Sequence, residues 1–245
     1  MSGVGPALMH VATPSLAIAE AGLAAGYDGL VVDLQHGEVG LESACTIMRA
    51  MPRGNPWLWA RVASLELGAI GRLLDSGATG IVAPTIETAE QARALVAATK
   101  YPPLGGRSLG PSRPALYPGE SYTEAANAVV RTVVQIETVA GVENAEEILS
   151  VPGVDSVYIG PADLAVSHGL PPRPDWTDGP VHEAHVRIAE VARAHDVTVG
   201  ISARTPEYAV GAFAADLLDY VGLGIDLVMV TAQANAHLAA LRSPQ

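Results

Sequence analysis

The sequence contains a single cysteine, few aromatic side chains and few charges. Cys45 alone cannot form an internal disulfide framework, so a disulfide-stabilised fold is excluded and a reducing compartment is expected. Aromatic residues make up 4% of the 245 residues and charged residues 16%, whereas 49% are hydrophobic. This composition excludes a disordered chain and predicts a large core filled by small aliphatic side chains.

Positive charge is also scarce, because 14 Lys and Arg residues face 26 Asp and Glu residues, for a formal net charge of −12. A surface of this sign repels phosphate backbones, so no nucleic-acid partner is expected. Apolar runs are too short or too interrupted to span a membrane, and the N-terminus lacks the basic region of a signal peptide. The sequence therefore predicts a soluble, cytoplasmic, globular protein without a membrane partner.

Short β-branched runs alternate with longer Ala- and Leu-rich stretches along the whole chain. Strands are predicted at Ala7–Val11, Gly29–Asp33, Trp57–Arg61, Gly80–Ala83, Val130–Glu137, Ser156–Gly160, Thr198–Ser202 and Tyr220–Ile225. Several of these runs are continuously apolar, which is typical of parallel strands buried on both faces. Eight β/α units in about 250 residues predict an α/β fold, a single (β/α)8 barrel domain over residues 1–245. A doubly wound open sheet is the alternative, since alternation alone does not close a sheet.

Helix starts are marked by three local patterns. Thr13-Pro14 and Thr205-Pro206 each place an N-cap side chain before a proline at the first helical position. Thr88 with Gln91 three residues later has the spacing of a capping box. Helices are therefore expected to begin directly after these capping residues.

Two segments interrupt the alternation. The first, Tyr101–Glu120, is rich in Pro and Gly and carries Arg107 and Arg113. Long ordered loops in compact domains are usually functional or mobile, and we expect this one on the face of the barrel that carries the site. The second, Leu170–Pro180, comes soon after a predicted strand end. This position predicts that it also lies on the face of the barrel that carries the site.

Ionisable residues gather at the C-terminal ends of the predicted strands, where parallel barrels carry their active sites. Glu137 and Asp163 follow neighbouring strands, so their carboxylates are expected to lie close together and to repel unless a cation lies between them. Such a pair, with water and substrate oxygens, suits a hard divalent metal ion. The alternative is that each carboxylate only caps the helix that follows it.

His36 and Arg61 stand at the same rim. A histidine directly after a buried strand is a candidate general base; the alternative, and the usual one for a lone histidine, is that local backbone groups satisfy it. Arg61 ends an otherwise apolar strand, and its planar guanidinium suits a carboxylate or an enolate oxygen. An ion pair with Asp33 or Asp75 is the competing interpretation. No lysine stands at a strand end, which disfavours a Schiff-base mechanism.

Three motifs, VVDLQH, VVQIET and YIGPADL, occur in this order between residues 31 and 164. Together they resemble the HpcH/HpaI family of class II, metal-dependent pyruvate aldolases, which includes 4-hydroxy-2-oxoheptanedioate aldolase and 2-dehydro-3-deoxyglucarate aldolase. The resemblance implies a (β/α)8 barrel and a hexamer formed by exchange of the last helix. It also implies small-molecule substrates: pyruvate or another 2-oxo acid, and an aldehyde.

The resemblance assigns roles to particular residues. It implies that Glu137 and Asp163 hold a divalent cation (Mg²⁺, Mn²⁺ or Co²⁺), with Asp163 also touching the substrate. Gln135 and the backbone of Ala162 are expected to contact the pyruvate moiety.

The remaining roles concern proton transfer and charge. The resemblance implies that His36 is the acid/base, that Asp75 raises the basicity of His36, and that Arg61 binds substrate and stabilises the enolate. One departure is Gln35, where the family motif often has glutamate.

The sequence thus predicts a carbon–carbon lyase that makes or cleaves 4-hydroxy-2-oxo acids through a metal-stabilised pyruvate enolate. A citrate-type lyase or synthase, or an oxaloacetate decarboxylase, would use the same site, and Arg107 and Arg113 would favour such polycarboxylates if they reached the barrel mouth. A carbon–carbon mutase and a non-catalytic 2-oxo-acid-binding barrel are further alternatives.

Overall fold

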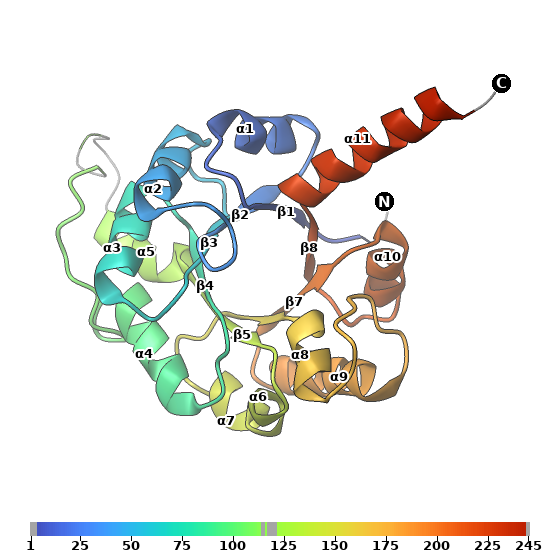
Figure 1. Cartoon of the computed structure of the whole chain (residues 1–245). Helices are drawn as coiled ribbons and strands as arrows, with labels where there is room; N and C mark the ends of the chain where they lie inside the picture. Colours follow the sequence, from blue (N-terminus) through green and yellow to red (C-terminus); the bar gives the residue numbers. More distant parts are fainter. Residues whose placement is uncertain (1–3, 114–115, 117–121, 244–245) are drawn as a thin grey trace.

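The computed structural model describes residues 4–113, 116 and 122–243, and its parallel strands close into a barrel in chain order (Figure 1). The strands are β1 (Ala7–Val11), β2 (Gly29–Asp33), β3 (Leu58–Arg61), β4 (Gly80–Ala83), β5 (Arg131–Ile136), β6 (Ser156–Ile159), β7 (Thr198–Ala203) and β8 (Tyr220–Ile225). Because β1 pairs with both β2 and β8, the predicted (β/α)8 barrel is confirmed and the open sheet is wrong.

Helices lie around the barrel, and those between strands connect the C-terminal end of one strand to the start of the next. They are α1 (Leu16–Ala24), α2 (Leu41–Ala50), α3 (Leu67–Ser76), α4 (Ala89–Thr99), α5 (Tyr122–Val129), α6 (Val139–Glu143), α7 (Ala145–Leu149), α8 (Pro161–Ser167), α9 (Gly179–Ala194), α10 (Pro206–Ala214) and α11 (Asp226–Arg242). No helix in the described part of the chain combines the length and apolarity needed to cross a bilayer.

Four aromatic residues pack against one another inside the barrel. The indole of Trp59 lies edge-on to the ring of Tyr220 with centroids 5.0 Å apart, and Tyr220 stacks on Tyr158 at 6.1 Å. Trp57 closes this group, with its ring 5.4 Å from Tyr220. Large rings thus fill the barrel interior below the mouth, while aliphatic side chains fill the layer between strands and helices.

Two of the three expected helix starts are confirmed. Thr205 caps α10, and Thr88 forms the full capping box with Gln91. The expectation for Thr13 is wrong, because the Oγ of Ser15 caps α1 and the Oγ1 of Thr13 instead donates to Asp226 at 2.6 Å. A stronger, charged acceptor near the end of β1 therefore takes the hydroxyl that was expected to cap the helix.

The described part of the loop that begins at Tyr101 lies at the N-terminal end of the barrel, so the expectation that it lies on the face of the site is wrong. It follows α4, and a helix in this fold ends on the side where the next strand begins. Arg107 donates to Asp75 at 2.7 Å, and Arg113 donates to the backbone oxygens of Ser76 and Arg49 at 2.6 and 3.1 Å. Residues 114–115 and 117–121 of this segment lie outside the described residues.

The second segment, 170–180, does lie on the C-terminal side, between α8 and α9. Asp175 accepts hydrogen bonds from the backbone amides of Arg204 and Thr205, both at 2.9 Å, and from the hydroxyl of Thr205 at 2.6 Å. These bonds join the segment to the end of β7.

The last helix, α11, extends outward from the barrel (Figure 1). Its first residue, Asp226, is buried, and along its length the helix exposes large apolar side chains. They are Leu227, Val228, Met229, Val230, Leu238 and Leu241. An exposed apolar stretch of this size is typical of an interaction surface.

Candidate active site

A buried ion pair joins the ends of β2 and β3. Asp33 and Arg61 are neighbours in the strand register, and Oδ1 and Oδ2 of Asp33 accept from Nε and Nη2 of Arg61 at 3.0 and 2.7 Å. Oδ1 also accepts the amides of Gln35 and His36 at 3.0 and 3.3 Å. Burial pushes the pKa of Asp33 upward, but the hydrogen bond and charge of Arg61 outweigh this and lower it.

The carboxylate of Glu137 is buried directly after β5. Its Oε1 accepts from the amide and the hydroxyl of Thr85 at 2.8 and 2.9 Å, and its Oε2 accepts from the side-chain amide of Gln135. Thr85 presents both donors from a left-handed backbone conformation, with φ +53°. Gly160 leaves the room that this arrangement needs, because a Cβ there would collide with Oε2 of Glu137.

A second carboxylate, that of Asp163, lies close enough to Glu137 to affect its pKa. Asp163 is exposed in the first turn of α8, and Ala162 before it contributes one of the helix's first amides. Burial raises the pKa of Glu137, and the charge of Asp163 adds to this, against the hydrogen bonds from Gln135 and Thr85. Burial and the charge of Asp163 therefore both disfavour ionisation of Glu137, and a cation bound beside it would offset them.

These residues fit a hard divalent cation. Its two carboxylate ligands would be Glu137 and Asp163, and the Oε1 of Gln135 is a buried acceptor without a hydrogen-bond partner in the described part of the chain. Among the same residues no cluster of three or more His, Cys, Asp or Glu could enclose a metal ion. The donor set is therefore that of an open site, in which water and substrate complete the coordination.

His36 is exposed in the loop after β2, at the same end of the barrel. Asp75 is not near it within one chain, because it lies in the last turn of α3, where its carboxylate binds Arg107. The structure thus brings Asp33, Arg61 and His36 together, and leaves Asp75 at the opposite end. Any contact between Asp75 and His36 would require a second copy of the chain.

Comparison with known proteins identifies the family. The sequence model of the HpcH/HpaI aldolase/citrate lyase family matches residues 7–232. The chain belongs to this family. The resemblance of the three motifs is thereby confirmed, and the chain is an enzyme of the lyase class.

Individual relatives of the HpcH/HpaI family cover nearly the whole chain. It is 36% identical over 234 residues to a hydroxypyruvate/pyruvate aldolase of Rhizorhabdus wittichii, covering 94% of this chain and 91% of the relative. It is also 36% identical over 236 residues to the 2-dehydro-3,6-dideoxy-6-sulfogluconate aldolase of Pseudomonas putida, covering 94% and 90%. A solved structure of the citrate synthase SbnG aligns with a TM-score of 0.85 and 28% identity, covering 98% of this chain and 94% of the other.

Beneath the rim of this HpcH/HpaI barrel lies a polar pair that sequence reasoning missed. The Nε2 of His10 on β1 lies 2.7 Å from the Oη of Tyr158 on β6, and both side chains are buried. Burial lowers the pKa of His10 to about 4, and the charge of Arg61 acts in the same direction. Gly222 makes room for the pair, because a Cβ there would collide with the Oη of Tyr158.

Asp226 is a second missed residue. Its carboxylate accepts the amides of Ala12 and Thr13, both at 3.0 Å, so it links the end of β1 to the start of α11. The sequence signal that could have identified Asp226 is its position directly after β8. No local sequence pattern pairs His10 with Tyr158.

Proposed function

We propose that the chain is a divalent-metal-dependent aldolase that makes or cleaves 4-hydroxy-2-oxo acids, with pyruvate and an aldehyde as the other reaction partners. The observation that carries this proposal is the buried Glu137 beside Asp163, on the same rim as an Arg61 held in place by Asp33. This arrangement offers two ligands for a cation and a fixed positive charge for an enolate.

Metal binding and substrate orientation are assigned to different residues at the rim. Glu137 and Asp163 would hold Mg²⁺, Mn²⁺ or Co²⁺, which when bound supplies Lewis-acid polarisation of the 2-oxo group. Gln135, the amide of Ala162 and Asp163 contact the pyruvate moiety and orient it.

Proton transfer and charge stabilisation are assigned to His36 and Arg61, which follow or end the strands β2 and β3. In the cleavage direction His36 accepts the proton of the C4 hydroxyl, the C3–C4 bond breaks, and its electron pair enters the enolate as the aldehyde leaves. Arg61 stabilises the oxygen on which negative charge develops, and Asp33 keeps the guanidinium in position. His36 then returns a proton to C3 to give pyruvate. Gln35, being neutral, leaves the immediate surroundings of His36 without the extra carboxylate common in the family motif.

The names of both aldolase relatives agree with this proposal. The citrate-type alternative has a structural neighbour in a citrate synthase. However, two arginines at the barrel mouth would have favoured polycarboxylates, and within one chain Arg107 and Arg113 do not reach the mouth. They bind Asp75, Ser76 and Arg49 at the other end of the barrel. Aldol chemistry is therefore the better supported function.

The test does not require knowledge of the aldehyde. With pyruvate in D₂O and Mn²⁺, Mg²⁺ or Co²⁺, the protein is expected to exchange the methyl protons of pyruvate, followed by NMR. EDTA should abolish the exchange, and His36→Ala should slow it by about 10²-fold or more, the usual range for loss of a general acid/base. A protein that exchanges no methyl protons with any of these metals, or exchanges them equally well in EDTA, would contradict the proposal.

We also propose that the chain forms a homo-oligomer, a hexamer by family resemblance, through α11. The exposed apolar side chains of α11 support this, since a single chain leaves them in water. Glutamate at both Leu227 and Val230 should yield a smaller species by light scattering. Val210→Glu on α10 is the matched control, as Val210 is 52% and Val230 56% exposed. An unchanged mass for the double variant would exclude this interface.

A further inference from the structure

A buried hydrogen bond crosses the interior of the barrel directly beneath the catalytic rim. It joins the Nε2 of His10 on β1 to the Oη of Tyr158 on β6, which are 2.7 Å apart, and the strands β7 and β8 lie between them. Gly222 on β8 leaves the space for this bond. A Cβ there would collide with the Oη of Tyr158 and lie 2.8 Å from the Nε2 of His10.

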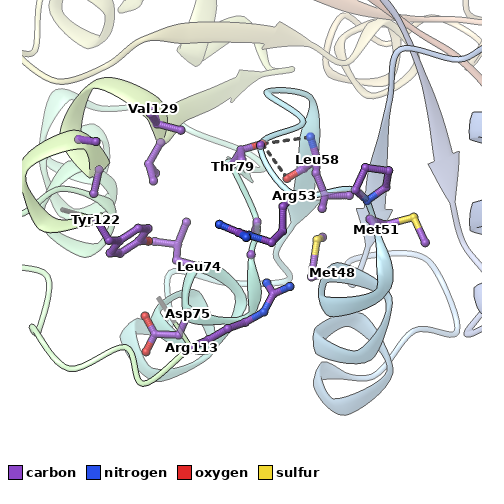
Figure 2. Close-up of a pocket in the computed structure, with 17 residues that line it drawn as sticks. Met48, Met51, Arg53, Leu58, Leu74, Asp75, Thr79, Arg113, Tyr122 and Val129 are labelled. Carbon is purple, nitrogen blue, oxygen red and sulfur yellow. Dashed lines mark hydrogen bonds between the residues drawn. The ribbon is translucent and has the colours of Figure 1, made fainter. Parts of the chain in front are cut away.

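The opposite end of the barrel does not reach this pair. A cavity of about 620 Å³ opens there between α2, α3 and α5 (Figure 2), and it is lined by Leu58, the first residue of β3, and by Thr79, directly before β4. Neither member of the pair lines this cavity. The rings of Trp59 and Tyr220 fill the barrel interior on that side. The polar surroundings of the pair are therefore those of the catalytic rim.

Each member of the pair stands beside a strand that carries residues of the proposed reaction. Tyr158 is next to Gln135 in the register of β5 and β6, and Gln135 is assigned to the pyruvate moiety. His10 is next to Val31 in the register of β1 and β2, two residues before Asp33. The bond thus connects the side of the barrel that contacts pyruvate with the side that holds the ion pair.

Charge effects agree with this placement. Burial is the main cause that lowers the pKa of His10, and the charge of Arg61 lowers it further, whereas the charge of Asp33 opposes both. Burial raises the pKa of Tyr158, and the charge of Arg61 opposes this increase. Both side chains therefore lie within the field of the Asp33–Arg61 pair, and both are neutral at neutral pH.

Packing alone does not account for a polar pair at this depth. The Nδ1 of His10 is buried and has no hydrogen-bond partner in the described part of the chain. Two apolar side chains of similar shape would fill the same space at little cost in stability, because no polar group would then need a partner. The reaction explains the two polar side chains better than folding does.

We propose that His10 and Tyr158 are positioning residues for enolisation of the 2-oxo acid, an inference that rests on the proposed aldolase function. Their hydrogen bond holds β6, which leads into the helix of Asp163, at a fixed distance from β1, which pairs with the strand of Asp33. Arg61 is thereby kept where negative charge develops on the enolate. Displacement of a reacting group by about 1 Å can lower a rate by about 10²-fold.

Removing the Oη of Tyr158 tests the proposal. Tyr158→Phe keeps the ring and should lower kcat for Mn²⁺-dependent exchange of the pyruvate methyl protons by about 10- to 10²-fold. KM for pyruvate and the rise in Tm with Mn²⁺ should not change, because the bond acts on the transition state and not on binding.

Tyr220→Phe is the matched control. The hydroxyl of Tyr220 is equally buried and bonds the Oγ of Ser156 at 2.8 Å, but it lies deeper in the barrel, two residues before Gly222 on β8. This variant should lose stability and keep kcat.

Variants of the partner separate positioning from stability. His10→Leu should lower kcat as Tyr158→Phe does, and the double variant should lose no more than either single one, since the bond is already absent. The free energy of unfolding of the double variant should return toward the wild-type value, because neither member of the pair is left without its partner. His10→Gln, whose amide can still bond the Oη of Tyr158, should restore most of the rate that His10→Leu loses.

Unchanged kcat in Tyr158→Phe overturns the proposal, as does a rate for His10→Gln no higher than that of His10→Leu. A double variant that recovers kcat together with stability, or an equal loss of kcat in Tyr220→Phe, would also overturn it, because the pair would then serve folding alone. A wild type that exchanges no methyl protons would instead overturn the proposed function, and this inference with it.

Discussion

Glutamine in place of Glu137 is expected to reduce metal-dependent exchange of the pyruvate methyl protons by about 10³-fold, the scale of losing several kcal/mol of transition-state charge stabilisation. The substitution keeps the shape of the side chain and an oxygen for the amide of Thr85. It removes the charge that would hold the cation.

A second readout separates metal binding from turnover. Mn²⁺ should raise the Tm of the wild type, because a ligand that binds only the folded state stabilises it, and Glu137→Gln should lose this shift. Glu143→Gln, which alters an exposed carboxylate on α6, is the control. It should retain both pyruvate exchange and the rise in Tm with Mn²⁺. Full exchange activity in Glu137→Gln would show that this carboxylate does not carry the reaction.

Removing one partner of the Asp33–Arg61 pair should have the largest effect on stability. The two side chains are only 5% and 11% exposed, so Arg61→Met leaves a buried carboxylate without its cation, at a cost of about 3–5 kcal/mol in the free energy of unfolding. The double variant Asp33→Leu with Arg61→Met should recover much of this loss, because no uncompensated charge remains. Both variants should lose pyruvate exchange, since Arg61 is absent.

An exposed ion pair provides the comparison. Arg72 and Glu42 are 52% and 76% exposed, and Arg72→Met should leave the free energy of unfolding almost unchanged, because water screens an exposed ion pair. Denaturant unfolding of the four proteins measures all of these values. If Arg61→Met costs no more than Arg72→Met, the buried pair does not contribute to stability in the way argued above.

The fold was predictable because its signals are local and repeated. Continuous apolar runs marked buried parallel strands, and β2 and β4 have the predicted boundaries. The rule that barrel sites lie at strand C-termini then selected Arg61 and Glu137 without knowledge of any partner. The structure places both at that end.

Contacts between distant segments were not predictable in the same way. Asp75 was paired with His36 by family resemblance, but the end of α3 lies where Arg107 is in reach. The loop after α4 was interpreted by its Pro and Gly content, although its position before a strand decides which end of the barrel it occupies. His10 and Tyr158 meet across the barrel from strands separated by 148 positions, and no sequence spacing indicates such a bond.

The closure of the barrel has a consequence for the order in which the chain acquires its structure during synthesis. The first strand, β1, pairs with the eighth, and Ala12 reaches Asp226 across 214 positions. Until β8 has been synthesised, one side of β1 has a row of backbone groups without hydrogen-bond partners in the sheet. The sheet therefore keeps two open edges until β8 has been made and reaches β1, and this one pairing removes both edges at once.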